Sequence, residues 1–342
     1  MVSGNFLLLD GMFIAYDHSG YIILSRIIAA FIQNQSVPIY YFISGYVFFL
    51  GIELSKDVYL RKIRNRIRTL LVPYLVWNMV FVLLYWLKTL PYMSSFSNEE
   101  DIVFGWREFF MSFLGYTSTD SFNWGDGIFP MNYPLWFLRD LIIVVIFTPI
   151  INVIIKYCKL YYIVSLGILW FMASILQWGR VIQLSNAFFF FSLGAYMSVN
   201  NKDMVAVFGK YFKLSTILFL ILGVAFIIVL EYSSECARII KTARILVGLL
   251  FAYNLAVYLL KKGYCKVNKF LASSSFFIYL SHAWVFERVR RLIFNAIDLN
   301  SDFWIIVAYL LTVFVTISLL LLAYYCGKRF MPGIFKVMIG GR

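Results

Sequence analysis

Residues 303–325 read FWIIVAYLLTVFVTISLLLLAYY and contain no charged side chain. As a helix with a rise of about 1.5 Å per residue, this segment is long enough to cross the roughly 30 Å hydrocarbon core of a bilayer. The whole chain has a similar character, because 62% of its 342 residues belong to the set AVILMFWYC and only 14% are charged. Soluble domains are nearer half apolar and a quarter charged. The sequence therefore predicts a membrane protein and excludes a soluble enzyme and a disordered chain.

The same reasoning extends outward to ten hydrophobic segments. We predict an all-α fold, a polytopic membrane helix bundle of about ten transmembrane helices, which forms a single domain over residues 1–342. A Ser-Gly pair at Gly45 allows close helix contact in the second segment, whereas the aromatic run 188–191 is expected to face lipid. The ten segments are 5–17, 37–51, 69–87, 134–155, 160–176, 187–199, 214–230, 245–260, 270–286 and 303–325.

Charge predicts the orientation of these segments. With the N-terminus in the cytoplasm, the cytoplasmic loops hold 19 Lys and Arg with three acids, whereas the outer loops hold 10 with 11 acids. Membrane proteins concentrate cations in cytoplasmic loops in this way. We therefore expect both termini in the cytoplasm, and we attribute the net charge of +13 to insertion and not to nucleic acid binding. Residues 92–133 then form an extracytoplasmic loop, whose amphipathic part 106–113 is expected to lie on the membrane surface as a partial lid.

A basic segment, 56–68, precedes the third hydrophobic segment on the cytoplasmic side. One interpretation is an interfacial helix whose cations meet anionic lipid. The other is a phosphate-binding cluster for a nucleotide-like donor, since the forked donors of arginine suit phosphate oxygens. On a helix the cations form two stripes, one of Arg61, Arg64 and Arg68 and the other of Lys62 and Arg66.

Five ionisable residues map to the outer half of the predicted bundle when 1.5 Å is counted per residue. An ionisable group within a membrane segment suggests function, because burying it without a partner is costly. The alternative is structural, namely a histidine satisfied by a neighbouring helix or an internal ion pair. Their common depth predicts one polar cavity open to the outside. The five are His18, Arg139, Asp140, His282 and Glu287.

Five strings of this sequence resemble, in order and over nearly the whole chain, the acyltransferase 3 family of integral-membrane acyltransferases. The resemblance implies an O-acyltransferase in the cell membrane that moves an acyl group, usually acetyl from acetyl-CoA. The implied acceptor is a hydroxyl of a surface polysaccharide or a lipid-linked glycan. The strings are FIAYDHS at 13–19, VPIYYFISGY at 37–46, RIRTLLVPYLVWN at 66–78, PLWFLRD at 134–140 and SFFIYLSH at 275–282.

The resemblance also implies residue roles. His18 matches the family's catalytic histidine and is expected to act as a general base on the acceptor hydroxyl, with a covalent acyl-histidine as a variant. The basic helix matches the region that holds the phosphates of CoA, which assigns them to Arg61, Arg64, Arg66 and Arg68. The residues expected to line the substrate cavity are Trp136, Arg139, Asp140, His282 and Glu287.

Acyl-CoA is expected as a co-substrate, without a permanently bound cofactor or a metal. The expected partners are membrane lipids and the glycan acceptor, with no nucleic acid. This chain departs from the family at Leu7, where an arginine is frequent, and at Thr69, where a second arginine is expected after Arg66. Two other classes stay open, namely a transporter or flippase for a charged metabolite or lipid-linked sugar, and an inactive family member.

Overall fold

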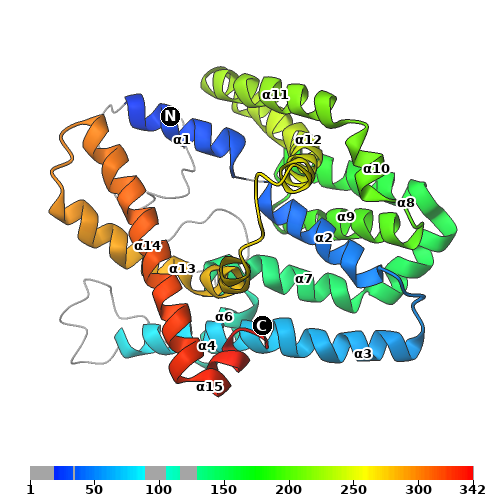
Figure 1. Ribbon diagram of the computed structural model, residues 1–342, viewed down its shortest axis with the longest axis horizontal. Coiled ribbons are helices and arrows are strands. Elements are labelled where there is room, and N and C mark those ends of the chain that lie inside the picture. The colour runs from blue at the N-terminus through cyan, green and yellow to red at the C-terminus, as the bar shows by residue number, and fades with distance from the viewer. Residues whose placement is uncertain (1–18, 34, 89–104, 116–128, 342) are drawn as a thin grey trace.

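The computed structural model describes residues 19–33, 35–88, 105–115 and 129–341 (Figure 1). All the secondary-structure elements in these ranges are helices. Seven segments of the described residues are long and apolar enough to cross a membrane. The predicted class, an all-α multi-pass membrane protein, is confirmed. The elements are α1 (Ser19–Phe31), α2 (Ser36–Phe49), α3 (Lys56–Arg66), η1 (Ile67–Leu71), α4 (Val72–Lys88), α6 (Trp106–Leu114), η2 (Tyr133–Leu135), α7 (Trp136–Ile146), α8 (Thr148–Leu176), α9 (Gly179–Val199), α10 (Met204–Gly209), α11 (Phe212–Tyr232), α12 (Ser234–Lys261), α13 (Lys269–Ala296), α14 (Asp302–Phe330) and α15 (Pro332–Met338).

The helix boundaries differ from the predicted ones where charges interrupt the apolar pattern. Helix α1 occupies a stretch that was predicted as an outer loop, while the predicted segment 5–17 lies outside the described residues. Helix α12 begins at Ser234 instead of residue 245, so Arg244 lies within it. Lysine and arginine end a hydropathy window but are good helix formers, which explains both differences. The break between 155 and 160 is confirmed, because Lys159 has non-helical backbone angles (φ 48°, ψ −125°) and divides α8 into two helices.

Helices α2 and α9 cross in close contact at the middle of the bundle (Figure 1). A Cβ atom on Gly45 would lie 2.0 Å from the carbonyl oxygen of Phe191, and a Cβ on Gly194 would lie 2.0 Å from that of Phe42. Glycine is therefore required at both positions, as predicted for Gly45. The prediction that 188–191 faces lipid is wrong, because Phe190 and Phe191 are fully buried. Helix α9 packs between α2 and α8, so most directions around it lead into protein.

Two short helices brace α4, which continues from α3 through the π-helical segment η1. Helix α6 confirms a helix in the predicted amphipathic part of the long loop, and the hydroxyl of Tyr74 donates a hydrogen bond to the carbonyl of Phe113 at its end. On the other side, the indole Nε1 of Trp77 donates to the carbonyl of Met338 in α15 at 3.1 Å. These two hydrogen bonds join α4 to α6 and to α15.

Candidate active site

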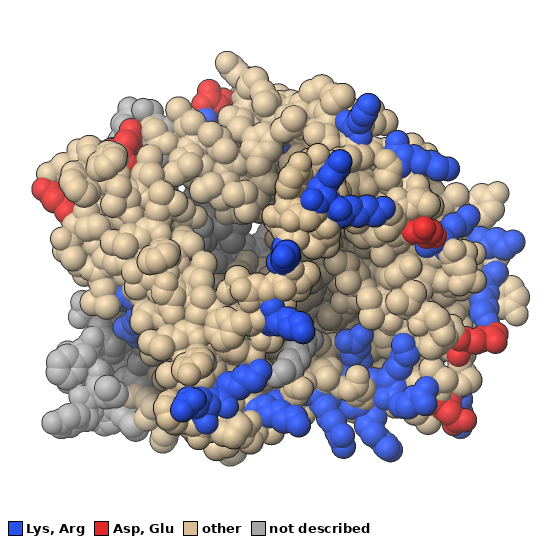
Figure 2. All heavy atoms as spheres, viewed as in Figure 1, with Lys and Arg blue, Asp and Glu red and all other residues tan. Residues whose placement is uncertain are grey.

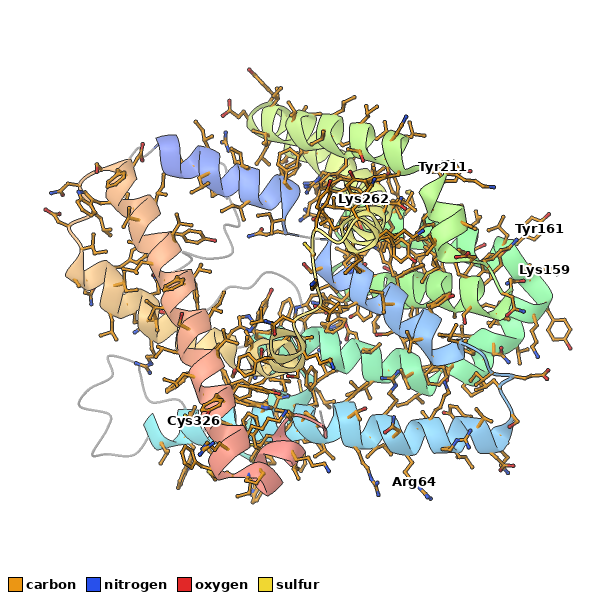
Figure 3. The ribbon with its side chains drawn as sticks, viewed as in Figure 1. Arg64, Lys159, Tyr161, Tyr211, Lys262 and Cys326 are labelled. Carbon is orange, nitrogen blue, oxygen red and sulfur yellow. The ribbon has the colours of Figure 1, made fainter. Side chains whose placement is uncertain are left out.

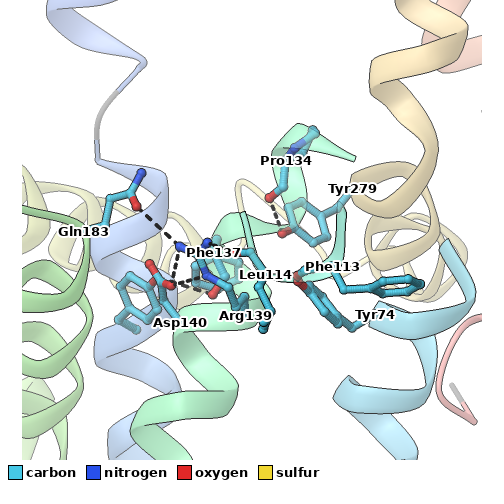
Figure 4. A network of polar contacts seen from close by, with 10 residues as sticks. Tyr74, Phe113, Leu114, Pro134, Phe137, Arg139, Asp140, Gln183 and Tyr279 are labelled. Atoms are coloured by element: carbon cyan, nitrogen blue, oxygen red, sulfur yellow. Dashed lines mark hydrogen bonds and ion pairs between the residues drawn. The ribbon is translucent and has the colours of Figure 1, made fainter. Parts of the chain in front are cut away.

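Helix α7 carries a buried ion pair at its beginning. The Nε and Nη2 atoms of Arg139 both lie 2.8 Å from the Oδ1 atom of Asp140, which is 0% exposed (Figure 4). Arg139 also reaches two other helices, because Nη1 donates to the carbonyl of Leu114 in α6 at 2.7 Å and Nη2 to the Oε1 atom of Gln183 in α9 at 3.3 Å. One guanidinium therefore joins α6, α7 and α9 at a single point.

The second carboxylate oxygen of Asp140, Oδ2, differs from Oδ1 in its hydrogen bonding. Its Oδ2 atom is buried and has no hydrogen-bond partner among the described residues. Buried polar atoms of proteins are nearly always hydrogen-bonded, and an ionised oxygen without a donor is costly. The Oδ2 atom is therefore an acceptor that no described residue uses.

Tyrosines from two other helices contact the start of α7. Tyr279 of α13 donates to the carbonyl of Pro134 at 2.6 Å (Figure 4). Tyr41 of α2 donates to the carbonyl of Phe137 at 3.3 Å. The ring of Phe137 packs against both, with centroids 4.7 Å from Tyr41 and 5.8 Å from Tyr279. Pro134 in η2 lacks an N–H group, so it opens this helical turn without losing a hydrogen bond.

Two asparagines extend the polar network into α4. The side chain of Asn78 donates to the carbonyl of Tyr74 at 2.9 Å and accepts from the backbone N–H of Asn132 at 3.3 Å. The side chain of Asn132 in turn donates to the carbonyl of Leu280 at 3.0 Å. Both asparagines are fully buried. The segment before η2 is thereby fixed between α4 and α13.

Four of the five strings that carry the family resemblance meet in this network. Tyr41 of the second string and Tyr279 of the last donate to carbonyls of the fourth string. Asn78 of the third string accepts from the backbone of Asn132, just before that string, and Tyr74 joins the network through Asn78. Residues far apart in the sequence thus assemble one site. The first string, with His18, lies almost wholly outside the described residues.

The other predicted cavity residues are placed as follows. Trp136 is the first residue of α7 and is partly buried. The Nδ1 atom of His282 lies 2.9 Å from the carbonyl oxygen of Tyr279, one turn earlier in α13. Glu287 pairs with Arg290 and Arg291 of its own helix, at 2.8 and 2.7 Å. The structure therefore brings Arg139 and Asp140 together, whereas the polar contacts described for His282 and Glu287 stay within α13.

The predicted basic helix is present as α3 and continues into η1. Arg61, Arg64 and Arg68 are exposed, and Arg64 extends away from the bundle (Figure 3). Lys62 of the second stripe points inward, donates to the carbonyl of Phe48 and lies 4.9 Å over the ring of that residue. Arg66 is partly buried. The two predicted stripes thus face different surroundings, one solvent or lipid and the other the body of the protein.

Cations are numerous on the face of the molecule that is seen in Figure 2. Figure 2 shows Lys and Arg over α3 and over the ends of α10, α11 and α12, with few acidic side chains between them. The same view shows a hollow in this face between α14 and α12. A ligand with phosphate groups is attracted to a surface of this charge.

Sequence reasoning did not single out the tyrosines, the asparagines or Gln183. Tyrosine is common in apolar helices, so Tyr41, Tyr74 and Tyr279 carry no signal by themselves in a chain with 24 tyrosines. Their membership of the strings that resemble the family was the available signal. Gln183 lies outside all five strings, and only its position opposite Arg139 identifies it.

One family model matches nearly the whole chain. The acyltransferase 3 family model, which describes an acyltransferase domain, matches residues 2–324. The match covers nearly the whole chain, so the resemblance seen in the five strings is confirmed. No curated protein matches the chain, and no solved structure matches it either.

Proposed function

Since the chain belongs to the acyltransferase 3 family, we propose that this membrane acyltransferase transfers an acyl group, acetyl in the simplest case, from cytosolic acyl-CoA to an extracytoplasmic hydroxyl. The acceptor is a glycan or a lipid-linked sugar, and the membrane is the cell membrane. The proposed topology has about ten transmembrane helices with both termini in the cytoplasm. The observation that carries the proposal is the meeting of the family strings around the buried carboxylate of Asp140.

In the proposed reaction His18 is the general base. Its imidazole takes the proton of the acceptor hydroxyl as the oxygen attacks the thioester carbonyl. The new C–O bond forms, the C–S bond breaks, and the proton passes from the imidazole to the sulfur of the departing CoA. Neutral imidazole is abundant at neutral pH because the unperturbed pKa of histidine is about 6.5.

Asp140 is proposed to support this step. A general base works best when its second ring nitrogen donates to an acceptor that fixes the tautomer. The free Oδ2 atom of Asp140 is such an acceptor, and Arg139 holds the carboxylate in place through two contacts of 2.8 Å to its Oδ1 atom. Asp140 is therefore a positioning residue in this proposal, whereas His18 is the catalytic residue.

The donor is proposed to bind at the arginines of α3 and η1. Arg61, Arg64, Arg66 and Arg68 supply positive charge where the phosphates of CoA would arrive from the cytosol. Within this set, Arg66 is partly buried, so its guanidinium is less hydrated than that of the exposed Arg64. A phosphate contact from Arg66 is therefore expected to contribute more to donor affinity.

The test uses purified protein in lipid nanodiscs. Release of free CoA from acetyl-CoA is measured with a thiol reagent, first with water as the acceptor and then with undecaprenyl pyrophosphate N-acetylglucosamine. His18→Ala is expected to lower transfer by about 10²–10⁴-fold, while CoA binding and the melting temperature stay as in wild type. His282→Ala is the matched control and is expected to have a milder effect.

The donor site is tested by comparing a partly buried arginine with an exposed one. Arg66→Gln is expected to raise the apparent KM for acetyl-CoA by roughly ten- to a hundredfold, the usual value of a charge-assisted hydrogen bond, and Arg64→Gln by less. CoA binding without thiol release by wild type, with every acceptor, would favour an inactive family member. Uptake of a labelled lipid-linked sugar across the bilayer without acyl transfer would favour a flippase.

A further inference from the structure

A second group of cations lies apart from the Arg139 site, between α1, α11 and α12, around one fully buried arginine. Arg244 of α12 is fully buried; its Nη2 atom donates to the carbonyl of Ala29 in α1 at 3.2 Å. Its guanidinium lies 5.0 Å over the ring of Phe226 in α11. Its Nε and Nη1 atoms are buried without a hydrogen-bond partner in the described part of the chain. A buried guanidinium in this state is costly unless an anion joins it.

The charges next to Arg244 increase this cost. Lys241 lies one turn earlier in α12, so the two positive side chains are neighbours on the helix surface and repel each other. Arg26 of α1 pairs with Glu231, and Arg238 pairs with Glu235 at 3.8 Å, which leaves these two arginines balanced. Lys241 and Arg244 have no acidic partner among the ion pairs of the described residues. We call Arg26, Arg238, Lys241 and Arg244 the α12 cation group.

Other buried polar atoms without a partner among the described residues lie along the contact between α1 and α12. The Nε atoms of Arg26 and Arg238 are buried without a partner among the described residues, and so are both amide atoms of Gln35. Gln35 lies against Gly248, one turn beyond Arg244. Ala30 of α1, Phe226 and Ala237 form the apolar cluster that brings these helices together. Buried donors of Arg26 and Arg238, and the amide donor and acceptor of Gln35, thus lie along one helix contact without a partner among the described residues.

The depth of Arg244 restricts the ligand. Arg244 lies ten residues after Ser234, about 15 Å along a helix whose 28 residues span about 42 Å. Because the hydrocarbon core is about 30 Å thick, Arg244 lies inside it. A free inorganic anion is poorly soluble there, whereas the phosphate of an amphiphile enters with its apolar chain. Helix α11 presents exposed apolar side chains to the surrounding lipid, including Ile221, Val224 and Ile228, and so supplies a surface for that chain.

We propose that the α12 cation group, in which Arg244 is fully buried and the other three cations are partly exposed, binds the phosphate group of a membrane amphiphile, with Arg244 as its main ligand. The phosphate belongs either to a phospholipid headgroup or to a polyprenyl phosphate carrier. Arg244 donates to the phosphate through Nε and Nη1, Lys241 adds a second positive charge, and the apolar chain lies against α11. This site is independent of acyl transfer, and its test requires no turnover.

The test is thermal unfolding of the full chain in a neutral detergent, followed by tryptophan fluorescence. Dodecyl phosphate is expected to raise the melting temperature of wild type in proportion to the logarithm of its concentration above Kd. Uncharged dodecanol and inorganic phosphate are expected to give no comparable shift. Arg244→Gln is expected to weaken the apparent affinity by roughly ten- to a hundredfold. Arg180→Gln, an exposed change of the same charge, is the matched control and retains the shift.

A second variant separates binding from folding. Arg244→Met keeps an unbranched apolar stem and removes the unpaired charge, so without ligand it is expected to melt at or above the wild-type temperature. It is also expected to lose the shift with dodecyl phosphate. Should Arg244→Met not fold, Lys241→Gln provides the same comparison, with a several-fold weaker affinity. Comparing dioleoyl phosphatidate with undecaprenyl phosphate then identifies the source of the phosphate.

Three results would overturn the proposal. The first is an equal shift with dodecyl phosphate in Arg244→Met and wild type, which would place binding elsewhere. The second is the absence of a shift in wild type with dodecyl phosphate, phosphatidate and undecaprenyl phosphate alike. The third is a shift given in full by inorganic phosphate, which would show that the ligand is not an amphiphile. None of these outcomes depends on His18 or on CoA, so the proposed acyl transfer stands or fails separately.

Discussion

Replacing Asp140 by asparagine tests the ion pair at the start of α7. Asparagine has nearly the same shape and keeps one carbonyl oxygen as an acceptor, but it removes the negative charge. Arg139 would then lose the negative charge beside it, while the carbonyl of Leu114 and the side chain of Gln183 still accept from it (Figure 4). The variant therefore isolates the charge of Asp140 from its size.

The expected cost follows from the contacts. Asp140 is fully buried, and its Oδ1 atom lies 2.8 Å from both Nε and Nη2 of Arg139. Breaking a buried ion pair by removing one partner costs about 3–5 kcal/mol. We take the lower half of this range, about 3–4 kcal/mol, because the amide oxygen still accepts one hydrogen bond. At roughly 2 °C per kcal/mol for a chain of this size, the melting temperature should fall by about 6–8 °C.

The assay is thermal unfolding in detergent followed by tryptophan fluorescence, together with acetyl transfer at a permissive temperature. Glu53→Gln is the control, since the pair of Glu53 with Lys156 is long, at 3.5 Å, and exposed; such pairs contribute about 0–1 kcal/mol. The double variant Arg139→Met/Asp140→Leu removes both charges and should recover part of the loss. If Asp140→Asn melts within 1 °C of Glu53→Gln, the pair does not stabilise the site as argued.

Three further outcomes are expected. Gly194→Ala should prevent folding or lower stability by at least about 3 kcal/mol, because its Cβ would lie 2.0 Å from a backbone oxygen, whereas Gly209→Ala, with no atom within 4 Å, should be tolerated; equal expression and melting of the two would contradict the close helix crossing. In intact cells, an impermeant thiol reagent should label Cys236 and not Cys265, both of which are exposed, and labelling of Cys265 would contradict the proposed topology. Tyr279→Phe should cost about 0.5–1.5 kcal/mol through loss of its hydrogen bond to the turn before α7, and an unchanged melting temperature would show that this bond does not hold the turn.

The sequence predicted the helices well and their ends poorly. Long apolar segments have few alternatives to a helix in a membrane, because every backbone polar group must be satisfied within the segment. The errors occur where cations lie inside helices, at Arg26 in α1 and at Lys241 and Arg244 in α12. A single sequence does not show that a neighbouring helix covers these cations. Burial of a charge is a property of the packing, which local composition does not encode.

The site was predicted in part, and for a similar reason. Arg139 and Asp140 were identified because charges are rare within apolar segments, and the structure brings them into one pair. Depth along the helices grouped His282 and Glu287 with them, but depth does not specify direction around a helix. Their polar contacts in α13 are local. The tyrosines of the site were missed because a hydroxyl that donates to a distant carbonyl is recognised only after the helices are placed.

Arg139 and Arg244 show how a membrane protein separates structure from binding. Arg139 has a carboxylate beside it and two further acceptors on other helices, so its charge is satisfied by the fold itself. Arg244 has one carbonyl and an aromatic ring, although it is more deeply buried. If both served packing alone, the deeper cation would need the better partners, because the cost of an unpaired charge rises as water is excluded. The order is the reverse, which is the arrangement expected when the second site takes an anion that the described residues do not supply.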